Sequence, residues 1–191
     1  MTLPCARFFF DFIDPLSYLV GREFAEIETP HETEVTWVPF ELRPPPTRLT
    51  SMDDPSLTER WSRARSEATR LGISFTPPDL VPWTRKAHEL ALFAHESGVG
   101  DVVRTRIFET YLLEGGDIGR VDVLVELGRQ AGLDGTETKA VLDVDRYEAA
   151  VVEARGSAEE LGISDTPTLV VEERRLRGFH NRTTLGTFLR S

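Results

Sequence analysis

Residues 7–19 read RFFFDFIDPLSYL, and this stretch decides the fold of the chain. Residues 7–12 form a short segment with Phe at four of its six positions and apolar side chains on both faces, which indicates a strand buried on both faces. Asp14 and Pro15 follow; Asp is a preferred N-cap, and Pro is preferred in the first helical turn. The stretch therefore predicts a helix over residues 15–28, with an apolar stripe at positions 16, 20, 24 and 27.

Outward from this stretch, the pattern predicts β-α-β at the beginning of the chain and α-β-β-α at its end. Residues 35–40 form the second expected strand, which is stopped by three prolines at 44–46. Helices are expected over residues 57–71, 84–97, 101–114, 120–131, 134–144 and 146–161, most of them followed by Gly. Strands at 168–171 and 174–177 and a helix at 182–189 complete the chain. The β elements therefore bracket a helical block.

Composition limits the classes of function. The chain has 191 residues, a formal net charge of −10 and one cysteine, Cys5. One cysteine excludes an intrachain disulfide and a metal site built from several thiolates, and we expect no metal site. The acidic balance argues against nucleic-acid binding, which needs clustered positive charge. No apolar run has the length of a membrane helix, and no basic segment followed by an apolar stretch opens the sequence. We therefore expect a soluble, cytoplasmic protein with no nucleic-acid or membrane partner.

Four stretches carry a resemblance to a known family: residues 9–19 (FFDFIDPLSYL), 70–75 (RLGISF), 82–88 (PWTRKAH) and 162–168 (GISDTPT). With the bracketing order of elements, they resemble the DsbA family of thioredoxin-fold proteins. That family includes thiol–disulfide oxidoreductases, 2-hydroxychromene-2-carboxylate isomerases and kappa-class glutathione transferases. The resemblance implies an α/β, thioredoxin-like fold formed by residues 1–48 and 148–191. It also implies a large all-helical insertion over residues 49–147, packed on the same core as a lid.

The corner between the first strand and the first helix departs from the family pattern. Redox members of the family carry the motif Cys-Pro-x-Cys at this corner. The corresponding residues here are Asp14-Pro15-Leu16-Ser17. Without two thiols an intramolecular dithiol cycle cannot run. The isomerase and transferase branch of the family carries Ser-Pro-Tyr-Ser at this corner, and the first Ser of that motif hydrogen-bonds the glutathione sulfur. A carboxylate at that position repels a thiolate and raises the thiol pKa, so Ser17 is the hydroxyl that remains for such a role.

Two interpretations of Asp14 stay open. It caps its helix, or it is a general base near a pocket, helped by Asp11 if both carboxylates face one cavity. Asp11 can instead accept backbone donors. Ser17 is either an exposed first-turn hydroxyl or, with Asp14, a catalytic candidate.

The C-terminal part supplies the other candidate ligand contacts. Thr166-Pro167 resembles the family's cis-proline element, where the backbone pairs with extended thiol or peptide ligands, and we expect a cis bond there. Asn181 and Arg182 lie at the position where the glutathione-using branch of the family carries the motif Gly-x-Asp-Arg. Arg182 is retained, whereas Asn181 replaces the acid and is also a good N-cap. Asp11, Pro15, Thr166, Pro167, Asn181 and Arg182 are thus the predicted ligand-binding residues.

Three functions remain open at this stage. The leading hypothesis is a DsbA-like protein without the dithiol that binds a small thiol or thiol conjugate at the Asp14–Ser17 and Pro167 corner. No cofactor is firmly implied, and glutathione or another low-molecular-weight thiol is the candidate. The second is a thiol-dependent isomerase or transferase that uses Ser17 and Arg182. The third is a non-catalytic binding or scaffold protein, marked by a closed corner. A homodimer through the insertion or a sheet edge is compatible with each.

Overall fold

The computed structural model describes residues 5–27, 33–76 and 79–190. Its central sheet has the strand order β2-β1-β5-β6. β1 (Cys5–Phe10) pairs in parallel with β2 (Glu34–Pro39) and antiparallel with β5 (Thr168–Val171), which in turn pairs antiparallel with β6 (Arg174–Arg177). Phe8 lies opposite both Trp37 and Leu169, so β1 occupies the middle of the sheet.

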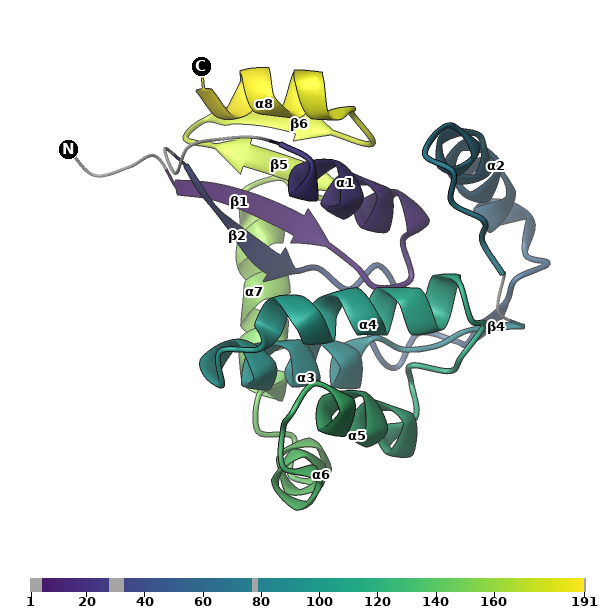
Figure 1. Ribbon diagram of the computed structural model, residues 1–191, viewed down its shortest axis with the longest axis vertical. Coiled ribbons are helices and arrows are strands. Elements are labelled where there is room, and N and C mark those ends of the chain that lie inside the picture. Colours follow the sequence, from purple (N-terminus) through teal and green to yellow (C-terminus); the bar gives the residue numbers. More distant parts are fainter. Residues whose placement is uncertain (1–4, 28–32, 77–78, 191) are drawn as a thin grey trace.

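β1 is buried on both faces, as predicted, because successive side chains point to opposite sides of the sheet. Phe8 and Phe10 belong to the main core, whereas Phe9 packs with Ala158 and Val170 in a smaller one. Ala158 lies on α7 (Glu148–Glu160), which covers one face of the sheet, while α1 (Pro15–Ala25) and α8 (Arg182–Arg190) lie on the other (Figure 1).

The block between β2 and α7 is mainly helical. It contains α2 (Pro55–Arg70), α3 (Arg85–Glu96), α4 (Gly100–Leu112), α5 (Val121–Gln130) and α6 (Gly135–Asp143). The expectation of an all-helical insertion needs one correction, because β3 (Thr50–Ser51) and β4 (Leu80–Val81) form a short antiparallel pair. α2 begins at Pro55, two residues earlier than predicted, because Asp54 caps it with a 2.9 Å bond from the Ser56 amide.

One core joins the inserted helices to the sheet. Phe10 and Phe12 contact Phe108 of α4, and the three side chains share a buried cluster with Tyr111. α2 stands apart from α3–α6 and lies beside α1 (Figure 1). The predicted helix over 15–28 ends at Ala25, and its last residue falls outside the described part. No helix among the described residues is both long and apolar enough to cross a bilayer.

Candidate functional site

The candidate site is built on Asp14, which caps α1. Its side chain is fully buried and accepts hydrogen bonds from the main-chain amides of Leu16 and Ser17, each at 3.2 Å. Capping arises locally, because the extended backbone of Asp14 turns its carboxylate back toward the free amides of the first helical turn. The helix-cap interpretation of Asp14 is therefore confirmed.

Two hydroxyl groups converge on the same carboxylate. Ser17 Oγ donates to Asp14 Oδ2 at 2.6 Å, and Thr166 Oγ1 donates to the same atom at 2.9 Å. Ser17 is fully buried, so of its two interpretations the exposed first-turn hydroxyl is wrong. Burial raises the pKa of Asp14, and the Arg60 guanidinium and the two hydroxyls oppose that shift. Both hydroxyl protons are directed at Asp14, so each oxygen has only lone pairs to offer to a further group.

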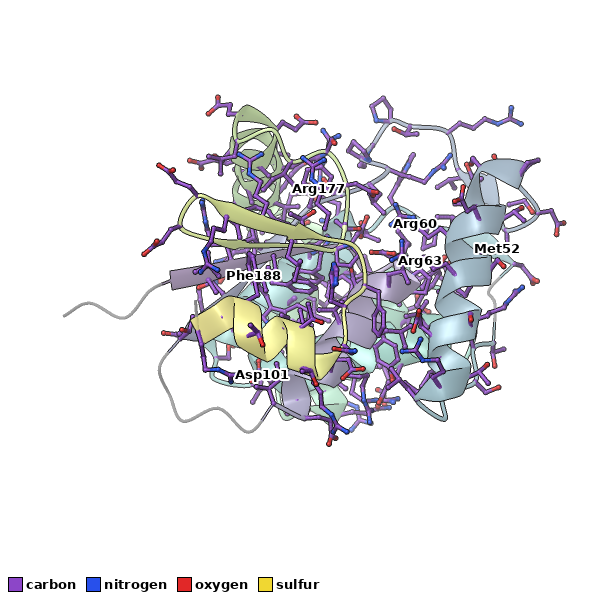
Figure 2. All side chains as sticks on the ribbon, turned by 90° about the horizontal axis from the view of Figure 1, so that it is seen from above. Met52, Arg60, Arg63, Asp101, Arg177 and Phe188 are labelled. Carbon is purple, nitrogen blue, oxygen red and sulfur yellow. The ribbon has the colours of Figure 1, made fainter. Side chains whose placement is uncertain are left out.

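Arg60 of α2 closes the corner. Its Nη1 lies 3.0 Å from Asp14 Oδ1 and 2.9 Å from the Thr166 carbonyl oxygen, to which it donates, and its Nη2 pairs with Asp165. In Figure 2, Arg60 lies on the side of α2 that faces the sheet. Five cavities among the described residues are lined by other side chains; one of about 670 Å³ lies beside Trp61 on α2. Asp14 thus lies beneath a paired guanidinium, and this closed corner is the feature that the sequence analysis associated with a non-catalytic binding or scaffold protein.

The Thr166–Pro167 peptide bond is cis, as predicted, and both main-chain polar groups of Thr166 are occupied. The Thr166 amide donates to Asp165 Oδ1 at 2.8 Å, and its carbonyl accepts from Arg60. The Pro167 carbonyl accepts from the Gly178 amide at 2.8 Å. The groups expected to pair with an extended ligand are therefore held by two side chains of the protein itself.

Asp11 does not share partners with Asp14. Its Oδ2 accepts from the Leu42 amide at 2.7 Å, and its Oδ1 lies 3.3 Å from His88 Nε2. Both Asp11 and His88 are fully buried in the core. Asp11 thus accepts a backbone donor, and the described contacts do not support a pair of carboxylates in one cavity. Pro15 is buried in the first turn of α1, directly beside Asp14.

Asn181 and Arg182 lie toward the other end of α1. Asn181 Oδ1 accepts from the Thr184 amide at 3.0 Å and so caps α8. The main-chain amide of Arg182 donates to Glu23 Oε2 at 2.9 Å, and Nη1 of the Arg182 side chain lies 3.8 Å from Glu26 Oε2. Glu23 is nine residues beyond Asp14, about 14 Å of helix rise. The structure therefore brings Asp14, Pro15, Ser17, Thr166 and Pro167 together and leaves Asn181 and Arg182 outside this group.

Arg60 and Asp165 are the site residues that sequence reasoning missed. Position 60 is 46 residues from Asp14 in the sequence, and its long-range partner cannot be read from local spacing. One signal was present: Trp61, Ala64 and Ala68 form the buried stripe of α2, so Arg60 lies at the edge of the core-facing side.

The parallel β1–β2 unit, the antiparallel β5–β6 hairpin and the cis-proline opposite the start of α1 define a thioredoxin-fold protein. The sequence model of the family described as DSBA-like thioredoxin domain matches residues 7–189, and the chain belongs to this family. The curated relative "Uncharacterized protein YwbO" of Bacillus subtilis (strain 168) is 32% identical over 173 residues, which span 88% of this chain and 86% of the relative.

Solved structures agree on the fold. The probable DsbA oxidoreductase SCO1869 from Streptomyces coelicolor has a TM-score of 0.84 at 21% identity and matches 97% of this chain and 88% of its own. A 2-hydroxychromene-2-carboxylate isomerase has a TM-score of 0.76 at 15% identity over 96% and 92%. The cytosolic disulfide reductase DsbM from Pseudomonas aeruginosa, solved with GSH, has a TM-score of 0.73 at 19% identity over 98% and 100%. The chain is thus related in fold to oxidoreductases and to an isomerase, and it has no Cys-x-x-Cys sequence.

Proposed function

We propose that this DsbA-family protein binds a small thiol or thiol conjugate at the corner and carries out no dithiol exchange. The corner consists of Asp14, Pro15, Ser17, Thr166 and Pro167. Glutathione and its S-conjugates are the ligands of choice for testing, because they combine a sulfur with peptide groups. α2 covers the bound ligand.

The occupied main chain of Thr166 carries the proposal. Asp165 accepts from its amide and Arg60 donates to its carbonyl, as a ligand carbonyl and a ligand amide would. Both substitutes reach solvent, with 57% of the Asp165 side chain and 24% of the Arg60 side chain exposed. A peptide-like ligand can therefore replace them by moving two side chains, while Asp14 and Ser17 remain fixed in the core.

The polarity of the corner favours a sulfur that is not ionised. Ser17 and Thr166 direct their hydroxyl protons at Asp14, so their oxygens can accept from a thiol S–H. A thiolate would meet the Asp14 carboxylate and be repelled. Thiol-dependent isomerase or transferase chemistry needs a thiolate nucleophile, so this arrangement favours binding of a thiol or thioether over its activation.

Isothermal titration calorimetry with glutathione and with S-methylglutathione tests the proposal. Wild-type protein should bind both. Asp165→Ala should bind about fivefold more tightly, because the variant lacks one competing hydrogen bond at the Thr166 amide. Glu173→Ala, an exposed residue in the β5–β6 turn, removes the same charge and should leave the Kd unchanged.

Two results would contradict the proposal. One is the absence of binding by either compound at millimolar concentration, and the other is an unchanged Kd in Asp165→Ala. Insulin reduction provides a separate test of the redox chemistry, because purified protein that turned over insulin disulfides would exclude a purely non-redox role.

A further inference from the structure

A second arginine lies at the corner, and the contacts described so far give it no role. Arg63 is three residues beyond Arg60 on α2, so the two side chains lie on the same side of the helix. Figure 2 shows both beside α2 on the side that faces the sheet. A Cβ atom built on Gly178 would lie 3.6 Å from Arg63 Nη2 and 3.7 Å from Nη1. Because the Gly178 amide donates to the Pro167 carbonyl, Arg63 lies next to the cis-proline.

Arg60 and Arg63 differ in their partners. Arg60 contacts Asp14, Asp165 and the Thr166 carbonyl. Within the part of the chain that the structure describes, Arg63 makes no ion pair or hydrogen bond. The two carboxylates of the corner are both engaged by Arg60, so neither of them pairs with the exposed Arg63 guanidinium.

Gly178 brings the main chain that follows β6 close to Arg63. Its φ of +79° is a left-handed conformation that glycine adopts without cost. A Cβ atom at this position would be in ordinary van der Waals contact with the guanidinium, so Arg63 lies directly beside this main chain. A ligand paired with Thr166 would extend past Pro167 toward this guanidinium.

We propose that Arg63 binds a carboxylate of the ligand, so that the site selects thiol compounds that carry a carboxylate group. This inference rests on the proposed function of the corner. A guanidinium presents paired N–H donors that match the two oxygens of a carboxylate. The ligand is then held at two points, by the Thr166 main chain and by Arg63, with its sulfur near Ser17. Arg63 is a ligand-binding residue that determines specificity.

Calorimetry with Arg63→Gln tests this assignment. The probes are S-methylglutathione and its diethyl ester, in which both carboxylates are blocked. The control is Arg65→Gln, which removes the same charge from α2 at a position two residues away, where Arg65 lies 5.8 Å from the Trp61 ring centroid. We expect Arg63→Gln to raise the Kd of S-methylglutathione about tenfold and to leave that of the ester unchanged. Arg65→Gln should leave both unchanged.

The outcomes separate this inference from the proposed function. If wild type binds S-methylglutathione and Arg63→Gln binds it equally well, the carboxylate site is overturned and the corner proposal stands. An equal loss for acid and ester, or an equal loss in Arg65→Gln, also overturns it, because the effect would then not depend on a carboxylate at Arg63. If wild type binds neither compound, both proposals are overturned.

Discussion

The ion pair between Asp14 and Arg60 gives the sharpest test of how the corner is held together. Asp14 is fully buried, Arg60 is 24% exposed, and their nearest polar atoms are 3.0 Å apart. Removal of one partner of a buried pair leaves the other uncompensated, so Arg60→Gln should lower the free energy of unfolding by about 3 kcal/mol. Asp14→Asn should cost less, about 1.5 kcal/mol, because the amide keeps one oxygen acceptor and Arg60 keeps Asp165.

The double variant isolates the interaction itself. Because neither charge remains, Asp14→Asn with Arg60→Gln should lose about 3 kcal/mol, which is about 1.5 kcal/mol less than the sum of the single losses. Urea denaturation of the four proteins at neutral pH measures this coupling. Glu67 and Arg70 are the matched control, since they lie on the same helix at the same 3.0 Å but with Arg70 64% exposed. Their coupling should stay below about 0.5 kcal/mol. A coupling for Asp14 and Arg60 no larger than that of the control would refute the reasoning.

Three further changes have definite expected results. Burial raises the pKa of Asp14 above 3.8, so the folded protein holds this proton more tightly than the unfolded chain. The contribution of Asp14 to the free energy of unfolding therefore falls as the pH rises from about 3.8 through the folded-state pKa. Urea denaturation at a series of pH values should show this fall in the wild-type protein and not in Asp14→Asn. Curves of stability against pH that run parallel for the two proteins would disprove it. Gly178→Ala should cost about 1–2 kcal/mol by urea denaturation because φ is +79°, and an unchanged midpoint would contradict this. Gly21→Ala should stabilise the protein by about 1 kcal/mol through helix propensity but destabilise it by about 2 kcal/mol, because the new Cβ would lie 2.8 Å from the Trp37 ring. We therefore expect a lower thermal midpoint. A higher midpoint would show that the ring moves aside at no cost.

Local chemistry in the sequence was sufficient for the elements that build the corner. Asp14 before Pro15 predicted both the cap and the start of α1, because capping depends only on residues within one helical turn. Thr166 before Pro167 predicted the cis bond through resemblance to the family. The aromatic run Phe8–Phe10 of β1 predicted burial on both faces, which the separate cores around Phe8 and Phe9 confirm.

Contacts between distant segments could not be predicted in this way. The pairing of Arg60 with Asp14 depends on where α2 lies relative to α1, and no local pattern fixes that placement. The same limit applies to Arg182, which the resemblance placed at the ligand and the structure pairs with Glu23 and Glu26. Its neighbour Asn181 was read correctly as a cap because its acceptor role is local.

Asp14 and Arg60 depend on each other, and together they account for the closed corner. A carboxylate at a fully buried helix start needs more than the two amides of the first turn, because burial removes it from water. The chain supplies two hydroxyls and one guanidinium, and the guanidinium also reaches the Thr166 carbonyl. The carboxylate that stands where redox members of the family have their first cysteine therefore holds Arg60, which covers the Thr166 carbonyl where we propose that a ligand pairs. A ligand that binds there must compete with Arg60 for Thr166 while Arg60 keeps Asp14 neutralised. In this proposal the requirement favours ligands whose own carboxylate binds Arg63, which makes no ion pair among the described residues, because Arg60 can then stay with Asp14.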